Sequence, residues 1–293
     1  MIELAERFYE NGDCVMERVI NADESWIANP EVFRVNREDA HSDHAFYEEK
    51  VTEYGLDMPL RQSLNGTWKF SYADVPQKRV KDFYEENSDI SSFADIKVPG
   101  HIELAGYDTC QYINTMYPWE GHEDLRPPFV PVKHNPVGSY VTYFDIDEAL
   151  LGKKTYISFQ GVEKAFYVWI NGQFVGYSED SFTPSEWDIT PFIKEKGNKL
   201  AVEVYKHSSA SWLEDQDFSG IFRDVYIYAV PDTHVRDIFV KAELKDDYIT
   251  GTLDCELQID GNISGTVGYE LVDKSGKSIL MRMGLALKET MHF

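Results

Sequence analysis

The strongest constraint on the fold is a period-two alternation of large apolar and polar residues, and its clearest instance is a hairpin near the middle of the chain. Residues 165–179 read AFYVWINGQFVGYSE. Asn171-Gly172 supplies the two residues that tolerate a positive φ in a type I′ turn. The pattern therefore predicts two antiparallel strands, Phe166–Ile170 and Gln173–Tyr177, in a fixed register.

The same alternation recurs along the chain and predicts an all-β fold. Strands with one buried face are expected around Trp68 and Phe70 and at Thr155–Phe159, and further strands are expected at Leu200–Val204 and at Ile221–Tyr228. Between them, residues 99–137 are rich in Pro, Gly, Asn and aromatic residues, which indicates a long irregular loop. Such loops inside compact domains often carry function.

Length and pattern divide the chain into three parts. Its 293 residues exceed the usual size of one compact domain. We expect an extended N-terminal arm without strand alternation at 1–60, a β-domain at 61–231 and an incomplete sandwich at 232–293. Strands of the last part are expected at Val235–Leu244, Tyr248–Ile259, Thr266–Val272 and Lys277–Met281, with a turn at Asp273–Gly276. Residues 284–293 show no alternation and are expected to be a frayed or non-native end.

Charge and composition exclude several classes of function. Asp and Glu number 51 against 28 Lys and Arg, a formal net charge of −23, which repels phosphate backbones and anionic bilayers. Neither nucleic acid nor a membrane is therefore expected as a partner. No signal segment and no bilayer-spanning apolar run is present, so a soluble cytoplasmic protein is expected. Three scattered cysteines, and a closest histidine pair, His41 and His44, in a polar stretch, give no disulfide framework or transition-metal site.

An acidic segment at 212–225, WLEDQDFSGIFRDV, is the strongest functional signal. Glu214, Asp215 and Asp217 lie within four residues, just before an apolar strand. Their carboxylates repel one another unless cations, hydroxyl-rich ligands or backbone donors satisfy them. Taken alone, such a cluster is more often a solvated surface loop, so the residues by themselves leave both interpretations open.

Short motifs rich in Gly, Pro and aromatic residues are spread over residues 29–280. They read SLNGTWKFSY, VPGHIELAGYDTCQYINTMYP, RPPFVP, NPVGSY, GYSEDSFTPSEWDIT, GNKLAVEV and EDQDFSGIFRDV. In this order they resemble the N-terminal region of family 2 glycoside hydrolases, above all the large lactose-hydrolysing β-galactosidases. The resemblance implies a jelly-roll β-sandwich of the galactose-binding-domain type, followed by a partial immunoglobulin-like β-sandwich. In that family a TIM barrel with two catalytic glutamates comes next, so no catalytic residue is expected in this chain.

The resemblance assigns substrate contacts to two residues. The asparagine of YINTMYP is Asn114 and the last acid of EDQD is Asp217, and their family counterparts help build a galactose subsite. An amide both donates and accepts, and a carboxylate accepts from two adjacent hydroxyls, so this pair suits a sugar. Asp217 is also expected to form part of a sodium site completed by the barrel. Full-length family members use Mg²⁺ and Na⁺, and no cofactor is expected within this chain.

Nearby residues have structural alternatives. Asn114, taken without the resemblance, is read as a turn cap. Trp119, Trp169 and Trp212 can stack on a sugar ring, but Trp169 lies inside a regular strand and is predicted to be core packing, while Trp212 stays undecided. Arg223, which precedes an aspartate, is expected to make a local ion pair or a packing contact.

Three hypotheses follow from these patterns. The first is an N-terminal portion of a β-galactosidase that contacts β-galactosides and other subunits, is inactive without the remaining domains, and is homo-oligomeric in its full-length form. The second is a stand-alone carbohydrate-binding module. The third is an inactive product that aggregates through an exposed face.

One departure from the family is that Phe218 runs directly into Ser219, where a short insert is usual, so either this copy is altered or the loop is remodelled.

Overall fold

The computed structural model describes residues 7–10, 13–16, 18–47, 58–110, 116–213, 218–286 and 290–292. The chain forms two compact units, of which the first comprises residues 1–38, 61–151 and 155–228 and the second residues 39–60, 152–154 and 229–293. As predicted, the fold is all-β. Helices in the described part are short 3₁₀ segments, namely η1 (Glu24–Ala28), η2 (Pro76–Lys78), η3 (Glu148–Leu150) and η4 (Ser209–Trp212). No described helix is long and apolar enough to cross a membrane.

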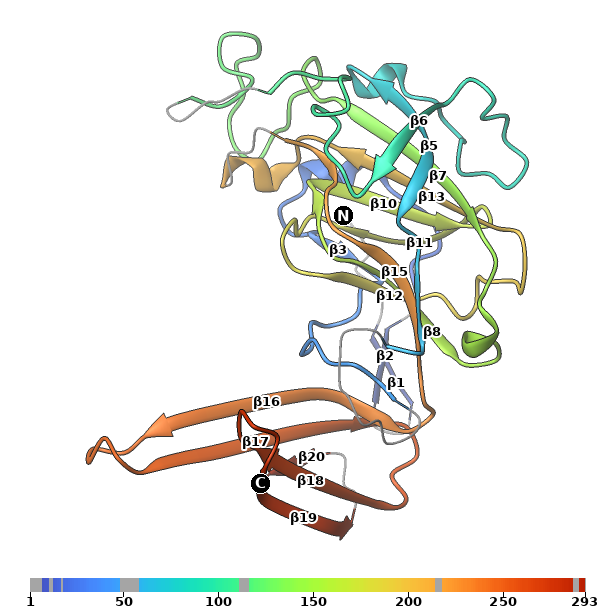
Figure 1. The fold of residues 1–293 in the computed structure, drawn as a ribbon. Coiled ribbons are helices and arrows are strands. Elements are labelled where there is room, and N and C mark those ends of the chain that lie inside the picture. Colours follow the sequence, from blue (N-terminus) through green and yellow to red (C-terminus); the bar gives the residue numbers. More distant parts are fainter. Residues whose placement is uncertain are drawn as a thin grey trace. The chain divides into compact units, whose positions relative to one another are not determined.

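The first unit is built on a seven-stranded antiparallel sheet (Figure 1). Its strands, in spatial order, are β3 (Arg34–Val35), β11 (Gln173–Ser178), β10 (Ala165–Ile170), β13 (Asn198–Tyr205), β7 (Val137–Phe144), β5 (Gly66–Ala73) and β6 (Ala94–Val98). Every residue of β10 and β13 is buried. These two strands, joined in register, therefore form the centre of the unit.

A four-stranded sheet packs against the first and makes the unit a β-sandwich. Its spatial order is β12 (Ser185–Asp188), β8 (Lys154–Phe159), β15 (Val225–Val230) and β4 (Arg61–Ser63), and a separate pair is formed by β9 (Val162–Glu163) and β14 (Gly220–Ile221). Trp187 of β12 is fully buried, contacts the ring of Phe166, and donates from Nε1 to the Val35 carbonyl at 3.0 Å. Gly176 leaves room for it, because a Cβ there would lie 1.9 Å from Trp187 Nε1.

The predicted hairpin is confirmed. Asn171 (φ 50°) and Gly172 (φ 79°) connect β10 to β11 through two positive-φ residues. The register is less simple than the sequence implied, because it shifts by one residue between Val168, which pairs with Gly176, and Trp169, which pairs with Phe174. The shift is a β-bulge, and a bulge adds a residue to one strand and increases its local twist.

The N-terminal arm contains short strands, although its sequence shows no strand alternation. Strand β1 (Arg7–Glu10) pairs with β2 (Asp13–Met16), and β3 joins the edge of the large sheet beside β11. Trp26 of η1 stacks on Tyr167, with ring centroids 6.0 Å apart, and so covers part of the outer face of the sheet. Strands of two to four residues are too short for an alternation to be visible in the sequence, which explains the miss.

Two expectations about the four-stranded sheet also need correction. The strand at 155–159 is buried on both faces rather than one, because Tyr156 stacks on Tyr228 at 5.3 Å and Ser158 accepts from Gln160. The single strand expected over 221–228 is divided between β14 and β15. Its middle residues instead bend toward Gly161, whose carbonyl accepts from the Phe222 amide at 3.2 Å.

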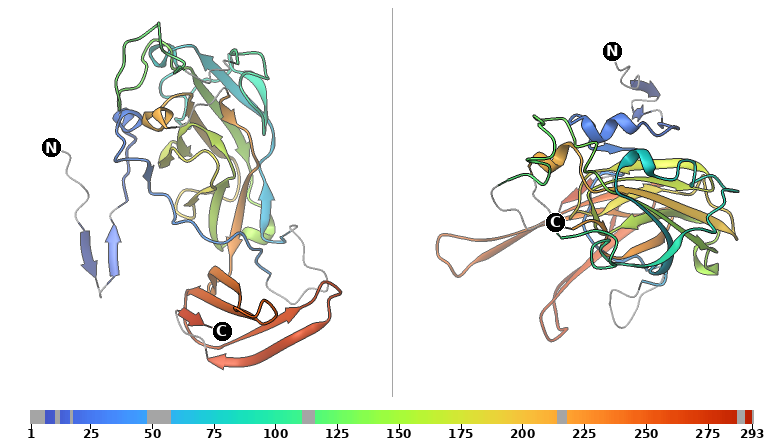
Figure 2. Two further views of the ribbon diagram at one scale, coloured as in Figure 1. Left: turned by 90° about the vertical axis from the view of Figure 1, so that its left-hand side faces the viewer. Right: turned by 90° about the horizontal axis from the view of Figure 1, so that it is seen from above.

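The second unit contains the strands predicted after residue 231, with altered ends (Figure 2). The predicted strands are β16 (His234–Leu244), β17 (Gly251–Asp260), β18 (Thr266–Val272) and β19 (Ser278–Ala286), and the structure adds β20 (Thr290–His292). Tyr248 has a φ of 54° and belongs to a turn, so β17 begins later than expected. The final segment is not a frayed end, since β19 continues to Ala286 and β20 pairs with β17. Isolated stretches of three residues give too little alternation to be recognised.

Candidate functional site

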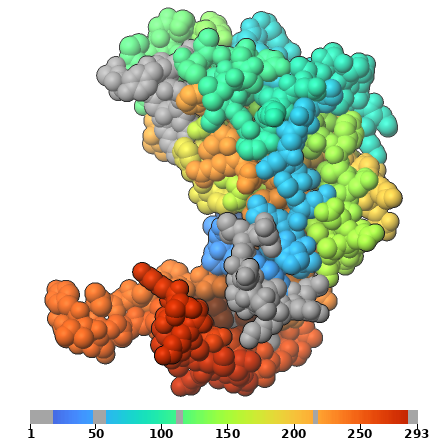
Figure 3. Space-filling model, in the orientation of Figure 1, coloured from blue at the N-terminus to red at the C-terminus, as the bar shows by residue number. Residues whose placement is uncertain are grey.

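The two residues predicted to contact substrate, Asn114 and Asp217, lie in segments 111–115 and 214–217, outside the described residues. The residues that border both segments are described, and they belong to the first unit. The first segment is part of the long connection between β6 and β7, which is free of strands where it is described, as predicted. Figure 3 shows much of this connection at the surface of the molecule.

One link between the two segments is made by Tyr117 and Trp212. Tyr117 follows Asn114 by three positions, and Trp212 precedes Asp217 by five. The Tyr117 hydroxyl donates to the Trp212 carbonyl at 3.0 Å, and the two rings meet edge to face with centroids 4.6 Å apart. The C-terminal border of one segment therefore contacts the N-terminal border of the other.

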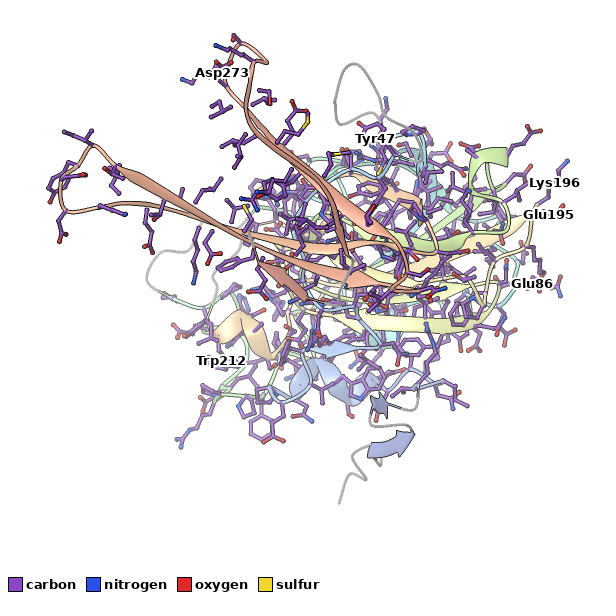
Figure 4. The ribbon with its side chains drawn as sticks, turned by 90° about the horizontal axis from the view of Figure 1, so that it is seen from below. Tyr47, Glu86, Glu195, Lys196, Trp212 and Asp273 are labelled. Carbon is purple, nitrogen blue, oxygen red and sulfur yellow. The ribbon has the colours of Figure 1, made fainter. Side chains whose placement is uncertain are left out.

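Trp119 and His207 extend this link into a buried aromatic cluster. Trp119 stacks on Tyr117 at 5.1 Å and meets the edges of Trp212 at 4.9 Å and His207 at 5.3 Å. Trp119 is only 1% exposed, whereas Trp212 is half-buried and lies on η4 (Figure 4). Burial, followed by the positive charges of Lys206 and Lys164, lowers the pKa of His207 to about 3, so the imidazole is neutral near pH 7.

A second link is a buried ionic cluster around Lys206, directly after the last residue of β13. Lys206 Nζ lies 2.8 Å from Glu103 Oε1 and 2.7 Å from Asp108 Oδ2. The backbone amide and the hydroxyl of Ser219 both donate to the Glu103 carboxylate at 2.8 Å. Asp108 precedes segment 111–115 and Ser219 follows segment 214–217, so the outer borders of both segments are held by one cluster.

The charges in this cluster compensate one another. Burial lowers the pKa of Lys206, but hydrogen bonds to Asp108 and Glu103 outweigh it and raise the pKa above the ordinary value of a lysine. Lys206 is therefore a cation that two carboxylates bind. Sequence reasoning missed this cluster. The available signal was a lysine directly after an uninterrupted buried strand, together with a glutamate in the apolar motif VPGHIELAGY.

Local structure fixes the turn that leads to Trp212. Asn135 binds both backbone groups of His207, donating to its carbonyl and accepting from its amide, each at 2.9 Å. Helix η4 begins with a capping box, in which Ser208 and Ser211 satisfy each other's backbone amides. The Ser208 hydroxyl also donates to Glu179 at 2.7 Å. The segment before Asp217 thus leaves the sheet along one defined path.

The remaining candidates are structural. Trp169 stacks on Tyr84 with centroids 4.6 Å apart and is 6% exposed, which confirms the prediction of core packing. Arg223 donates to the Phe182 carbonyl and lies over the rings of Phe182 and Phe222, so it makes the expected packing contact. Over the described ranges, no group of three or more His, Cys, Asp or Glu residues could hold a metal ion.

Comparison with known proteins places the first unit in a family. The profile of "Glycosyl hydrolases family 2, sugar binding domain" matches residues 61–231. A protein named beta-galactosidase from Clostridium acetobutylicum is 61% identical over 259 residues, which cover 87% of this chain and 29% of that protein. A beta-galactosidase large subunit from Lactobacillus helveticus is 46% identical over 276 residues, covering 89% of this chain and 44% of the other. The chain thus spans less than half the length of either relative.

Solved structures support the fold. The crystal structure of a Bacteroides uniformis beta-glucuronidase resembles this chain with a TM-score of 0.59 at 19% sequence identity, covering 80% of this chain and 27% of that one. An identity this low indicates a shared architecture only.

Proposed function

Because the chain belongs to family 2 of the glycosyl hydrolases, we propose that it is the part of a β-galactosidase that contacts the galactose unit of a β-galactoside. The observation that carries this proposal is the 61% identity to a relative named beta-galactosidase. By family resemblance, the motifs YINTMYP and EDQD favour a galactosidase over a β-glucuronidase or a β-mannosidase, in agreement with this proposal. The substrate is a terminal, non-reducing β-D-galactose residue, as in lactose.

In this proposal Asn114 and Asp217 bind the sugar together. Support comes from their borders, since Tyr117 contacts Trp212, and Lys206 with Glu103 joins Asp108 to Ser219. An amide can donate to one hydroxyl and accept from another, while a carboxylate accepts from two neighbouring hydroxyls. A site that pairs with the galactose hydroxyls rejects epimers because its own buried polar groups would be left without partners.

Bond cleavage requires groups from outside this chain. A retaining glycosidase uses two carboxyls about 5–5.5 Å apart, one as acid and base and one as nucleophile. The buried carboxylates of Glu103, Glu179, Glu186 and Glu203 each accept hydrogen bonds from partners inside the sandwich. The buried carboxylate of Glu163 lies 3.7 Å from His101 Nδ1. We therefore assign no catalytic residue here, and we propose that the reactive pair belongs to the part of the relatives that this chain does not span.

Metal sites are also proposed, from the resemblance to family 2 glycoside hydrolases. Asp217 would contribute one carboxylate oxygen to a sodium ion, and its remaining ligands, like a magnesium site, would lie beyond this chain. Removal of sodium from the assembled enzyme by exchange for a larger alkali cation should weaken galactoside binding. The large-subunit relative also favours an assembly of several subunits. A cytoplasmic location stays a prediction.

The test is hydrolysis of a chromogenic β-galactoside. The chain alone is expected to show no turnover, and mixing it with a polypeptide that carries the remaining length of the Clostridium relative is expected to restore turnover. Asn114→Ala and Asp217→Ala should each lower kcat/KM in the mixture by about 100-fold or more, since each removes hydrogen bonds to the sugar. A mixture without activity, or one indifferent to both substitutions, would refute the proposal.

A stand-alone carbohydrate-binding module is the second candidate, favoured by the match to a sugar-binding domain. Calorimetry with galactose and lactose separates the two functions. Saturable binding by the chain alone, lost in the Asn114 and Asp217 variants, would favour the module. We expect only weak heat, because a few hydrogen bonds on an open surface barely exceed the entropy lost on association.

A further inference from the structure

One buried carboxylate, Glu179, connects the large sheet to the helical turn that precedes the proposed galactose contacts. Glu179 directly follows β11 and is 5% exposed, and its backbone amide donates to the Phe33 carbonyl at 3.0 Å. It belongs to the motif GYSEDSFTPSEWDIT, to which the proposed function assigns no role. The sheet, and not the long connection between β6 and β7, therefore fixes the position of Glu179.

Both oxygens of this carboxylate accept hydrogen bonds, one from the sheet and one from the start of η4. Oε1 accepts from the Tyr177 hydroxyl on β11, and Oε2 accepts from the Ser208 hydroxyl at 2.7 Å. An ionised carboxylate accepts at both oxygens, whereas a protonated acid or an amide carries hydrogen on one side. The two donors are therefore matched to the ionised form of Glu179.

The bond to Ser208 sets the place where η4 begins. Ser208 is fully buried and is the N-cap residue of this helix, which ends four residues later at Trp212. There the Trp212 carbonyl accepts from the Tyr117 hydroxyl, and Nε1 donates to the Phe129 carbonyl at 2.8 Å. Glu179 is thus joined, through one helical turn, to two parts of the connection between β6 and β7.

These contacts place the geometry of the proposed site under the control of Glu179. The borders of the segments that contain Asn114 and Asp217 meet at Trp212, so a displacement of η4 would move one segment relative to the other. We infer, on the basis of the proposed function, that Glu179 is a positioning residue whose ionised carboxylate holds η4 where Asn114 and Asp217 reach the same galactose unit. Glu179 itself makes no contact with the sugar and acts through Ser208.

The charge of Glu179 gives this role a pH dependence. Burial raises the pKa of Glu179 above the ordinary value of a glutamate, although the hydrogen bonds at both oxygens and the positive charge of Lys164 oppose the rise. The neighbouring phenols of Tyr177 and Tyr167 stay neutral, because burial raises the pKa of each. His207, with a pKa of about 3, is also neutral, and η4 contains no titratable residue. Galactoside binding is therefore expected to weaken as pH falls and Glu179 takes up a proton.

The test is the KM and kcat of a chromogenic β-galactoside in the mixture of this chain with the remaining length of the Clostridium relative. Ser208→Ala should raise KM about tenfold with kcat nearly unchanged, because it removes a bond that places binding groups. Glu179→Gln should raise KM about three- to tenfold, since the charge-assisted bond to Ser208 becomes a neutral one. The double variant should match Ser208→Ala alone, because the two substitutions remove the same bond.

Tyr177→Phe is the matched control. It removes the bond to the opposite oxygen of Glu179, so KM should stay unchanged even where urea denaturation shows a loss of stability. As pH falls, the ratio of the KM of Ser208→Ala to that of the unmodified chain should approach one, because protonation of Glu179 weakens the same bond. A ratio that is independent of pH, additive effects of Ser208→Ala and Glu179→Gln, or an equal rise of KM in Tyr177→Phe would overturn the inference.

A measurement on the chain alone reports on η4 without catalysis. In the ¹⁵N-labelled chain, Trp212→Phe assigns the Trp212 signal among six indole N–H signals. That signal should shift in Glu179→Gln and in Ser208→Ala, and it should stay in place in Tyr177→Phe. A Trp212 signal that is fixed in all three variants overturns the inference and leaves the galactosidase proposal intact.

Failure of the galactosidase proposal has a different signature. A mixture that is indifferent to Asn114→Ala and Asp217→Ala refutes that proposal, and the positioning role of Glu179 with it, even where the Trp212 signal shifts. A mixture that responds to both substitutions but not to Glu179→Gln or Ser208→Ala refutes the positioning role alone.

Discussion

At the scale of single residues, Lys206 has the largest structural role near the candidate site. Two carboxylates surround this buried ammonium group, and one of them also holds Ser219. A buried charge pair contributes little net stability compared with apolar packing, but removal of one partner leaves the other charge buried and uncompensated. Replacement of either Lys206 or one of its carboxylate partners is therefore expected to destabilise the fold.

Lys206→Met is expected to lower the free energy of unfolding by about 3–5 kcal/mol, measured by urea denaturation, because Glu103 loses its countercharge in a buried position. The matched control is Lys78→Met, which removes an equally short but exposed ion pair to Asp74. Its effect should stay within about 0.5 kcal/mol. Equal effects of the two substitutions would contradict the role given to the cluster.

The lowered pKa of His207 predicts that the stability of the folded chain depends on pH. Its pKa in the folded chain is about 3, against about 6.5 in the unfolded chain. The unfolded state therefore takes up the proton first as pH falls, so stability is fully present above about pH 6.5 and is lost toward pH 3. Between pH 7 and pH 5 the chain should lose about 2 kcal/mol more than His207→Gln does, in parallel urea titrations. Identical losses would show that His207 is not buried as a neutral ring.

At the scale of elements, the contact of Trp187 with Gly176 joins the two sheets. Gly176→Ala places a methyl group where the indole lies, 1.9 Å from Nε1. We expect a loss of about 1–3 kcal/mol or more in thermal or urea unfolding, since the ring would have to leave its position against β11. Gly251→Ala is the control, because its Cβ meets only the Glu243 carbonyl at an ordinary 3.7 Å. A neutral Gly176→Ala variant would mean that the sheets pack differently.

Strands with clear local signals were predictable, and long-range contacts were not. The Asn171-Gly172 turn and the alternation around Trp68 have causes within a few residues, so they were found. The strand expected at 221–228 is divided into β14 and β15 by contacts with the Gly161 carbonyl, which is distant in sequence. The partners of Lys206 are likewise about 100 positions away in the case of Glu103 and Asp108, and no periodicity reports such a pairing.

At the scale of the whole molecule, the chain is a β-sandwich member of family 2 of the glycosyl hydrolases that spans part of the length of its relatives. It covers 29% of one relative and 44% of another, and its motifs identified the family because they are many and ordered. The assignment of Asn114 and Asp217 as sugar contacts depends on that resemblance, whereas the contacts between their bordering residues come from the structure.

Cross-linking tests the central claim, that Asn114 and Asp217 lie side by side, most directly. In a chain with its three cysteines replaced by serine, Asn114→Cys/Asp217→Cys should be joined by a short bismaleimide, detected by mass spectrometry of the digested protein. The control pairs Asn114→Cys with Glu195→Cys. Glu195 lies beyond the end of β13 that is opposite to Trp212 (Figure 4), and the strand itself is about 25 Å long. The account predicts a cross-link in the first pair and none in the control. Absence of the link in the first pair would contradict it.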